Sequence, residues 1–274
     1  MAQDRYADGG FMKKIGFIGA GNMGGALAIS AKKSGAEVFL YDKDEDKAKA
    51  LAESIGAAFL SNTEIAEKCD FVFLAVKPNI IPFAMAEIGD AFSKNKNGVL
   101  VSMAAGVAIR SIAEERVGYP IIRIMPNTPA QVGEGLILWC RNSAVSDAAL
   151  ADFLEVMAPA GALMEIDEAK IDAASAISGC GPAFAYMFIE ALADGGVECG
   201  LPRDVSQKLA AQTLLGAAKM VQLSGKHPGE LKDAVCSPGG STIEGVAALE
   251  RGSFRAVASS AVRAAYEKTL KLGK

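Results

Sequence analysis

Short apolar runs alternate with amphipathic segments along the chain as far as about residue 165. The apolar runs predict five strands, over residues 14–18, 37–41, 71–75, 99–102 and 121–124. Their near-continuous hydrophobicity is typical of parallel strands that helices cover on both faces. Helical periodicity between the runs predicts helices over residues 23–33, 44–54 and 109–116. The pattern therefore indicates an α/β fold with a doubly wound sheet, and two further runs add strands at its edge, over residues 135–139 and 162–166.

Strand signals stop after about residue 167, and helical periodicity takes over. Pro182 stands at the first position of a predicted helix that runs to Val197, a position that proline favours. A second helix is predicted from a cap at Asp204 to Leu223, and a last one over residues 254–272. Because these helices are apolar on more than one face, we expect them to pack against a second copy of the chain.

The change of pattern predicts two domains. The first is a Rossmann-type dinucleotide-binding domain over residues 12–167, and the second is an all-helical substrate-binding and dimerisation domain over residues 168–274. The polar stretch before Met12 is predicted to be an extension outside the first domain.

Composition narrows the class of protein. Of the 274 residues, 51% are apolar and 22% are charged, which is typical of a globular protein. A net charge of −4, without a long basic run, gives no reason to expect nucleic acid or an anionic membrane as a partner. No uninterrupted apolar run reaches the roughly 20 residues of a membrane span, so we expect none.

Cysteine and histidine usage limits the chemistry. The five cysteines are odd in number, far apart and without a C-x-x-C pair, which argues against a disulfide framework or a thiolate zinc site. We therefore expect no metal and a reducing, cytoplasmic location. A mechanism that needs two histidines is excluded, because His227 is the only one, and its Lys-His-Pro-Gly setting favours a structural role.

A glycine-rich motif, Gly19-Ala-Gly21-Asn-Met-Gly24, lies between the first predicted strand and the first predicted helix. In that context Gly19 permits a tight turn, Gly21 lets a pyrophosphate approach the backbone, and Gly24 lets the helix pack on the strand. The N–H groups of the first helical turn then face the phosphates. A glycine-rich packing turn without a ligand is the alternative interpretation.

Asp42 ends the second predicted strand, where a carboxylate accepts hydrogen bonds from the adenosine ribose. The same carboxylate repels a 2′-phosphate, so the sequence favours NADH over NADPH, although Lys43 beside it partly offsets the repulsion. The alternative is that Asp42 is only a turn or cap residue.

Three loops follow strands at the edge of the sheet where open α/β proteins bind ligands, at residues 75–78, 103–106 and 125–129. Lys77 is extended by the proline after it, and it is either a catalytic acid or a backbone contact with a solvated side chain. The prolines on either side of Asn127 allow a rigid turn with a cis peptide bond.

Two loops in the helical half combine small residues with the start of a helix, at residues 178–182 and 237–242. Such loops offer backbone N–H groups to an anion. Ser241 and Thr242 add hydroxyls that donate or accept hydrogen bonds at any working pH. Helix capping by these two side chains is the simpler alternative.

Motif by motif, the chain resembles the pyrroline-5-carboxylate reductase family from Lys14 onward. The matching stretches include Gly-Phe-Ile-Gly-Ala-Gly-Asn-Met at 16–23, Phe-Leu-Ala-Val-Lys-Pro at 73–78, Met-Pro-Asn-Thr-Pro at 125–129 and Asp-Ala-Val-Cys-Ser-Pro-Gly-Gly-Ser-Thr at 233–242. The last of these is the most specific. The resemblance implies an NAD(P)H-dependent oxidoreductase that reduces 1-pyrroline-5-carboxylate to L-proline, the last step of proline biosynthesis.

The resemblance also implies which residues form the site. The coenzyme, NADH or NADPH, should contact Ile18, Gly19, Ala20, Gly21, Asn22, Met23, Asp42, Asn62, Ala75, Val76, Lys77, Pro78, Met103, Ala104 and Ala105. The substrate should lie on Val235, Ser237, Gly240, Ser241 and Thr242. Thr242 is the implied catalytic residue, near the ring nitrogen of the imine.

The implied reaction needs few acid–base groups. A cyclic imine can arrive already protonated, so orientation of two reactants is the main task. The resemblance further implies an interlocked homodimer formed by the helical domain, assembled in some members into a larger ring.

Two other functions compete with this one. A β-hydroxyacid dehydrogenase-like oxidoreductase shares the glycine-rich motif, but it needs a lysine one turn after the Gly-x-Gly of its second domain. Here Gly179-Cys-Gly181 is followed by Pro-Ala-Phe-Ala, without a lysine. A non-catalytic NAD(P)-binding protein is the other alternative, and the 233–242 signature argues against it.

Overall fold

The structure is a computed structural model that describes residues 12–115 and 118–272. The described residues form two compact units, one made of residues 12–115, 118–179 and 266–272, the other made of Cys180–Ala265. The predicted extension before Met12 lies outside the described residues. The predicted domain boundary between residues 167 and 168 stays a prediction, although the last strand does end just before it, at Glu165.

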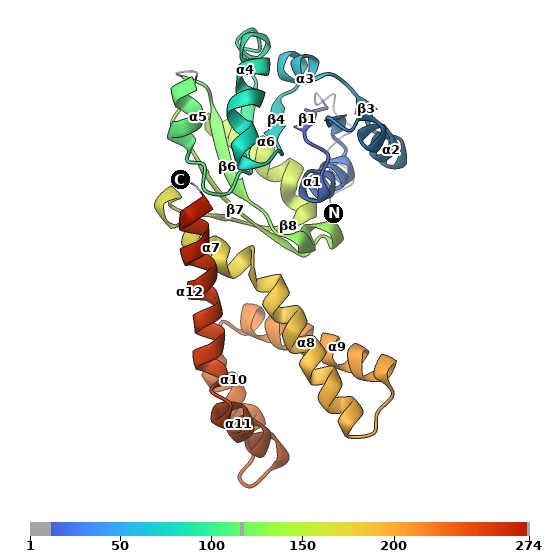
Figure 1. Ribbon diagram of the computed structural model, residues 1–274, viewed down its shortest axis with the longest axis vertical. Coiled ribbons are helices and arrows are strands. Elements are labelled where there is room, and N and C mark those ends of the chain that lie inside the picture. The colour runs from blue at the N-terminus through green and yellow to red at the C-terminus, as the bar shows by residue number, and fades with distance from the viewer. Residues whose placement is uncertain (1–11, 116–117, 273–274) are drawn as a thin grey trace. The chain divides into compact units, whose positions relative to one another are not determined.

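The first unit is built on a sheet of eight strands (Figure 1). Their order is β3-β2-β1-β4-β5-β6-β7-β8, and β6–β7 is the one antiparallel pair in this sheet. The strands are β1 (Lys14–Ile18), β2 (Glu37–Tyr41), β3 (Ala58–Phe59), β4 (Phe71–Leu74), β5 (Val99–Ser102), β6 (Ile121–Met125), β7 (Gly135–Arg141) and β8 (Gly161–Glu165). Every residue of β4, β5 and β6 is buried, as the apolar runs predict for parallel strands between two helical layers.

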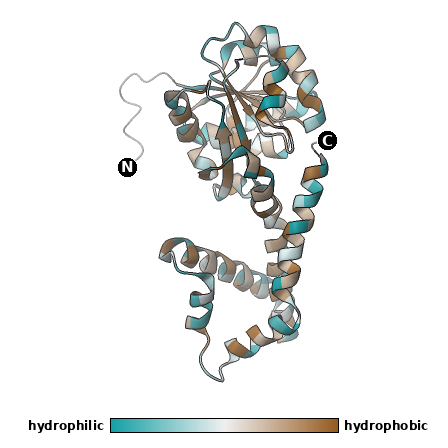
Figure 2. Ribbon diagram, turned by 90° about the vertical axis from the view of Figure 1, so that its left-hand side faces the viewer, coloured by the Kyte–Doolittle hydropathy of each residue, from teal (hydrophilic) through white to brown (hydrophobic). Residues whose placement is uncertain are grey.

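Helices cover both faces of this sheet, so the fold is the doubly wound Rossmann type that the sequence predicts. The helices of the first unit are α1 (Asn22–Lys33), α2 (Glu45–Ile55), α3 (Asn62–Lys68), α4 (Ile81–Phe92), α5 (Ile109–Glu115), α6 (Asp147–Met157) and α7 (Ile171–Ser178), with short 3₁₀ turns η2 (Pro78–Ile80), η3 (Thr128–Val132), η4 (Ala158–Ala160) and η5 (Glu168–Lys170). One apolar core lies under α1, α2 and α6 and a second under α3, α4, α5 and α7. Figure 2 shows the strands between them as apolar.

The helices that follow are α8 (Gly181–Glu198), α9 (Arg203–Ser224), α10 (Pro228–Val235), α11 (Ser241–Arg251) and α12 (Phe254–Leu272). Pro182 lies in the first turn of α8, as predicted. Asp204 does not cap α9, because the N-cap is Pro202 and Asp204 lies inside the first turn. The helix α10 was not predicted, because its eight residues are too few for a clear apolar period.

Large apolar side chains of the second unit are exposed. Tyr186 and Met187 on α8, Leu223 on α9 and Val257 on α12 are all at least 60% exposed. By length and composition alone, the helical stretch Glu168–Glu198 is long and apolar enough to cross a membrane. This differs from the sequence prediction, which expected no membrane span because no uninterrupted apolar run is long enough. Only 11% of its apolar window is buried within the chain, so this surface is available to another partner.

Candidate active site

The glycine-rich turn joins β1 to α1, and two of its glycines are required by packing. Gly19 has φ +108°, and a side chain there would overlap the carbonyl of Ala75. A methyl group at Gly24 would overlap the carbonyl of Gly19. At Gly21, by contrast, φ is −66° and no atom lies within 4 Å of an added Cβ. Of the three motif glycines, Gly21 is therefore the one whose missing side chain is not explained by the protein's own packing.

The start of α1 is suited to an anion. Gly21 is the N-cap and forms no side-chain cap, and the first turn of α1 carries no acidic residue. The N–H groups of this turn therefore keep their partial positive charge. Together with the open space at Gly21, they fit the pyrophosphate of a dinucleotide.

Asp42 supports the glycine-rich turn as well as facing a cavity. One carboxylate oxygen accepts the N–H of Ala20 at 2.8 Å, and the other accepts the N–H of Asp44 at 3.1 Å. Each oxygen can accept a further bond, so these contacts do not prevent hydrogen bonds with a ribose. The bond to Ala20 is a role of Asp42 that sequence reasoning missed.

The cavity beside this turn has a volume of about 560 Å³. It brings together eight of the residues predicted to contact the coenzyme, namely Ile18, Gly19, Gly21, Asp42, Asn62, Ala75, Val76 and Lys77. Ala20 and Asn22 instead line a smaller cavity of about 300 Å³. The other predicted residues, Met23, Pro78 and Met103 to Ala105, line neither cavity.

Several residues of the larger cavity were not predicted. Ile80, Phe83, Ala84 and Glu87 come from η2 and α4, and Phe83 is 72% exposed. The helix α4 was not among the predicted helices. The buried positions 81, 84, 85, 88 and 92 have helical spacing and are the signal that would have found it.

Lys77 lies in the loop after β4, and it is extended, as predicted from the proline that follows it. Its backbone is extended, with φ −63° and ψ 151°, and Pro78 begins η2. The side chain is exposed and lines the cavity. Both interpretations of Lys77, acid and backbone contact, therefore remain compatible with its position.

The loop after β6 is locked by a buried side chain. Asn127 donates from Nδ2 to the carbonyl of Ser178 at 2.9 Å, and its Oδ1 accepts the N–H of Leu136 at 2.8 Å. The peptide bonds before Pro126 and Pro129 are trans, as are all others in the described part of the chain, so the cis bond that the sequence allows is not present. Asn127 thus holds the end of α7 against this loop.

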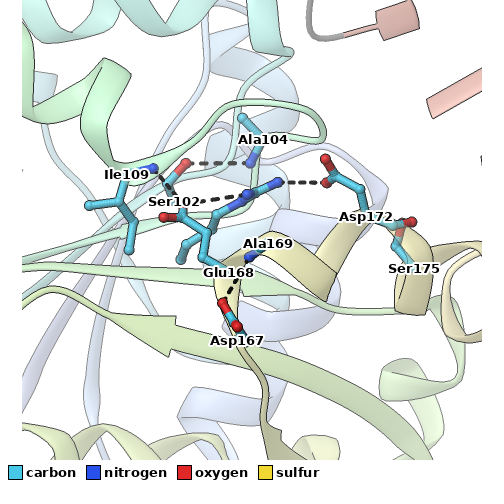
Figure 3. A network of polar contacts seen from close by, with 9 residues as sticks. Ser102, Ala104, Ile109, Asp167, Glu168, Ala169, Asp172 and Ser175 are labelled. Atoms are coloured by element: carbon cyan, nitrogen blue, oxygen red, sulfur yellow. Dashed lines mark hydrogen bonds and ion pairs between the residues drawn. The ribbon is translucent and has the colours of Figure 1, made fainter. Parts of the chain in front are cut away.

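A buried arginine links β6 to α7 and, through Glu168, to the end of the loop between β5 and α5 (Figure 3). Arg123 on β6 is 2% exposed, and its Nη2 donates to Asp172 on α7 at 2.8 Å, while Nη1 lies 3.4 Å from Glu168. Glu168 also accepts the N–H of Ile109, the first residue of α5, at 2.7 Å. The network fixes the end of the loop that contains residues 103–106. Sequence spacing gives no sign of it, since the paired residues are more than forty positions apart.

The predicted substrate residues lie in the second unit, at the turn between α10 and α11. Val235 is the last residue of α10 and is 67% exposed. Gly240 is the N-cap of α11, and Ser241 and Thr242 are its first two helical residues. The N-cap interpretation of the two hydroxyls is therefore wrong, because a glycine occupies that position. Ser237 faces this turn closely enough that a side chain at Gly240 would overlap its hydroxyl.

The hydroxyls at this turn are available. Ser241 and Thr242 are exposed, and their side chains make no hydrogen bond to the described residues. The N–H groups of the first turn of α11 lack partners within the helix. This group of hydroxyl and N–H donors fits a small anionic substrate, although Glu244 adds one carboxylate to the first turn of α11.

His227 and the buried cysteines are not catalytic candidates. His227 caps α10, where its Nδ1 accepts the N–H of Gly229 at 3.0 Å, which supports the structural interpretation. Burial raises the pKa of the Cys69 thiol to about 12 and that of Cys140 to about 11, so neither is a nucleophile at neutral pH. Over residues 12–115 and 118–272, no three His, Cys, Asp or Glu side chains are grouped as metal ligands.

A Rossmann unit with an open glycine at the start of α1, and a helical unit with a donor-rich turn, define an NAD(P)-dependent oxidoreductase. Family comparison agrees: residues 14–106 match the family described as "NADP oxidoreductase coenzyme F420-dependent", and residues 168–272 match "Pyrroline-5-carboxylate reductase dimerisation".

Similar proteins then identify the family. Pyrroline-5-carboxylate reductase of Escherichia coli is 43% identical over 96% of this chain and 99% of its own, and that of Arabidopsis thaliana is 41% identical over 94% and 95%. The Plasmodium falciparum pyrroline carboxylate reductase structure with NADP bound is 36% identical, with a TM-score of 0.84 over 96% of this chain and 98% of its own. The chain belongs to the pyrroline-5-carboxylate reductase family.

A solved structure from the competing hydroxyacid dehydrogenase class is more distant. A 3-hydroxyisobutyrate dehydrogenase of Mycobacterium tuberculosis is 16% identical, with a TM-score of 0.52 over 79% of this chain and 72% of its own. At that level the likeness concerns the fold alone. The shared glycine-rich turn therefore does not indicate a hydroxyacid as substrate.

Proposed function

We propose that this protein reduces 1-pyrroline-5-carboxylate to L-proline with NADH or NADPH, the last step of proline biosynthesis. The observation that carries the proposal is the donor-rich turn at residues 235–242, in a chain that matches its family over nearly the whole length. Oxidation of a reduced coenzyme that depends on added 1-pyrroline-5-carboxylate tests the proposal.

The reduced nicotinamide, when bound, supplies a hydride to the imine carbon. The first unit holds the coenzyme: the N–H groups of α1 bind the pyrophosphate, and Asp42 and Asn62 face the adenosine half. Pro78 and residues 103–105 also contact the coenzyme in this proposal, as the family resemblance implies. The exposed Phe83 adds an apolar wall to the same cavity.

The second unit orients the substrate. The N–H groups at the start of α11 and the hydroxyls of Ser237 and Ser241 bind the carboxylate, with Val235 against the ring. Thr242 forms a hydrogen bond at the ring nitrogen. When the imine arrives protonated, the hydroxyl oxygen accepts its N–H, so no strong acid is needed. Placement of the reactants is thus the main contribution of the protein.

Asp42 sets part of the coenzyme preference in this proposal. Asp42→Asn keeps an oxygen for the Ala20 N–H but removes the charge, so the ratio of kcat/KM for NADPH to that for NADH is expected to rise about tenfold. Asp42→Ser should shift the ratio in the same direction but lower both values, since the shorter side chain loses the support of the turn. An unchanged ratio in Asp42→Asn would mean that the carboxylate serves the turn and does not face the ribose.

In this proposal the helical unit forms a homodimer, and several such dimers assemble into a larger ring. The exposed apolar side chains of α8, α9 and α12, within the segment that matches the dimerisation family, support the dimer. The cytoplasm is the proposed location, supported by five cysteines that are all free.

A further inference from the structure

Asn62 carries a buried oxygen that the protein does not use. It is the first residue of α3, where Ser61 and Glu64 form a capping box that fixes the first turn. The Asn62 side chain is 4% exposed, and its Oδ1 is buried without a hydrogen-bond partner. A buried acceptor without a partner costs free energy, which a bound molecule with a donor would recover.

Glu87 determines which end of that amide is left over. Asn62 Nδ2 donates to Glu87 Oε2 at 2.9 Å, across from α3 to α4. An ionised carboxylate only accepts hydrogen bonds, so the amide must turn its NH₂ group toward Glu87 and leave its oxygen for another partner. Both residues line the 560 Å³ cavity that also contains Asp42.

We infer that Glu87 is a positioning residue for coenzyme selectivity, acting through the Asn62 amide. With Glu87 in place, Asn62 keeps its oxygen as an acceptor in the cavity that the Asp42 carboxylate also lines, and these two acceptors fit the free ribose hydroxyls of NADH. A 2′-phosphate brings acceptors instead of donors, so it is disfavoured by both groups. The inference rests on the proposed placement of the adenosine half in this cavity.

Equilibrium binding to the purified full chain tests the inference without imine reduction. We expect Glu87→Ala to release the amide, which can then turn its NH₂ group into the cavity. The ratio of the NADPH Kd to the NADH Kd, measured by titrating the fluorescence of each coenzyme, should fall about 3- to 10-fold, the range for one ordinary hydrogen bond. Glu87 is exposed, so the variant is expected to fold normally.

Two controls separate this role from a general effect of charge. Glu67→Ala removes an exposed carboxylate from α3 that does not line the cavity, and it should leave the ratio unchanged. In an Asn62→Ala background, with folding checked by thermal unfolding, Glu87→Ala should no longer change the ratio, because its route of action is gone. The inference is overturned if Glu87→Ala leaves the ratio unchanged, weakens both coenzymes equally, or still shifts the ratio without Asn62. Normal coenzyme binding without imine reduction would count against the proposed function instead.

Discussion

Thr242→Ala is expected to lower kcat/KM for 1-pyrroline-5-carboxylate by about 10- to 1000-fold, the range for loss of one well-placed hydrogen bond to the reacting group. The hydroxyl of Thr242 is exposed at the start of α11 and has no partner among the described residues, so its removal leaves no buried group unsatisfied. Stability should therefore change little. The Kd for coenzyme should also stay close to the parental value, because every residue lining the coenzyme cavity belongs to the first unit.

Thr242→Ser is the matched control for this variant. It keeps the oxygen and loses only a methyl group, so most of the activity should remain. If the alanine variant, checked for folding and dimerisation, reduces the imine at the parental rate, the hydroxyl takes no part in the reaction. Orientation of the substrate would then depend on the backbone N–H groups of α11.

Gly21→Ala is expected to weaken binding of both coenzymes by about 10- to 100-fold, as for the loss of one charge-assisted hydrogen bond to a phosphate. The backbone at Gly21 suits alanine, and no protein atom lies within 4 Å of the added methyl group. The melting temperature should thus stay unchanged. Coenzyme titration and thermal unfolding of the same sample measure the two effects.

Gly24→Ala provides the contrast. Its methyl group would overlap the carbonyl of Gly19, so this variant should lose stability as well as coenzyme affinity. Parental coenzyme affinity in Gly21→Ala would show that the open space is not the place where the pyrophosphate approaches, and the glycine-rich turn would be a packing turn only.

The central sheet was predictable because its strands are buried on both faces. A strand such as β4 has to be apolar throughout, and it therefore appears in the sequence as an uninterrupted apolar run that is easy to recognise. Short elements on the surface leave weaker signals. The two residues of β3 and the eight of α10 fall below the length at which a period can be recognised.

The two halves of the site were predictable to different degrees. The glycine-rich turn combines a motif with a strand and a helix, so its position follows from the sequence. The contacts of Asn127, Arg123 and Asn62 join residues that are far apart along the chain, and only the fold brings them together. The roles of Thr242 and its neighbours came from resemblance to a family, since exposed hydroxyls alone are found at many helix starts.

The measurement that tests the account most directly is coenzyme oxidation by the purified full chain, followed at 340 nm with and without 1-pyrroline-5-carboxylate. The account predicts oxidation of NADH or NADPH only when the imine is present, with L-proline as the product. A folded sample that binds coenzyme yet shows no turnover with either one would contradict it.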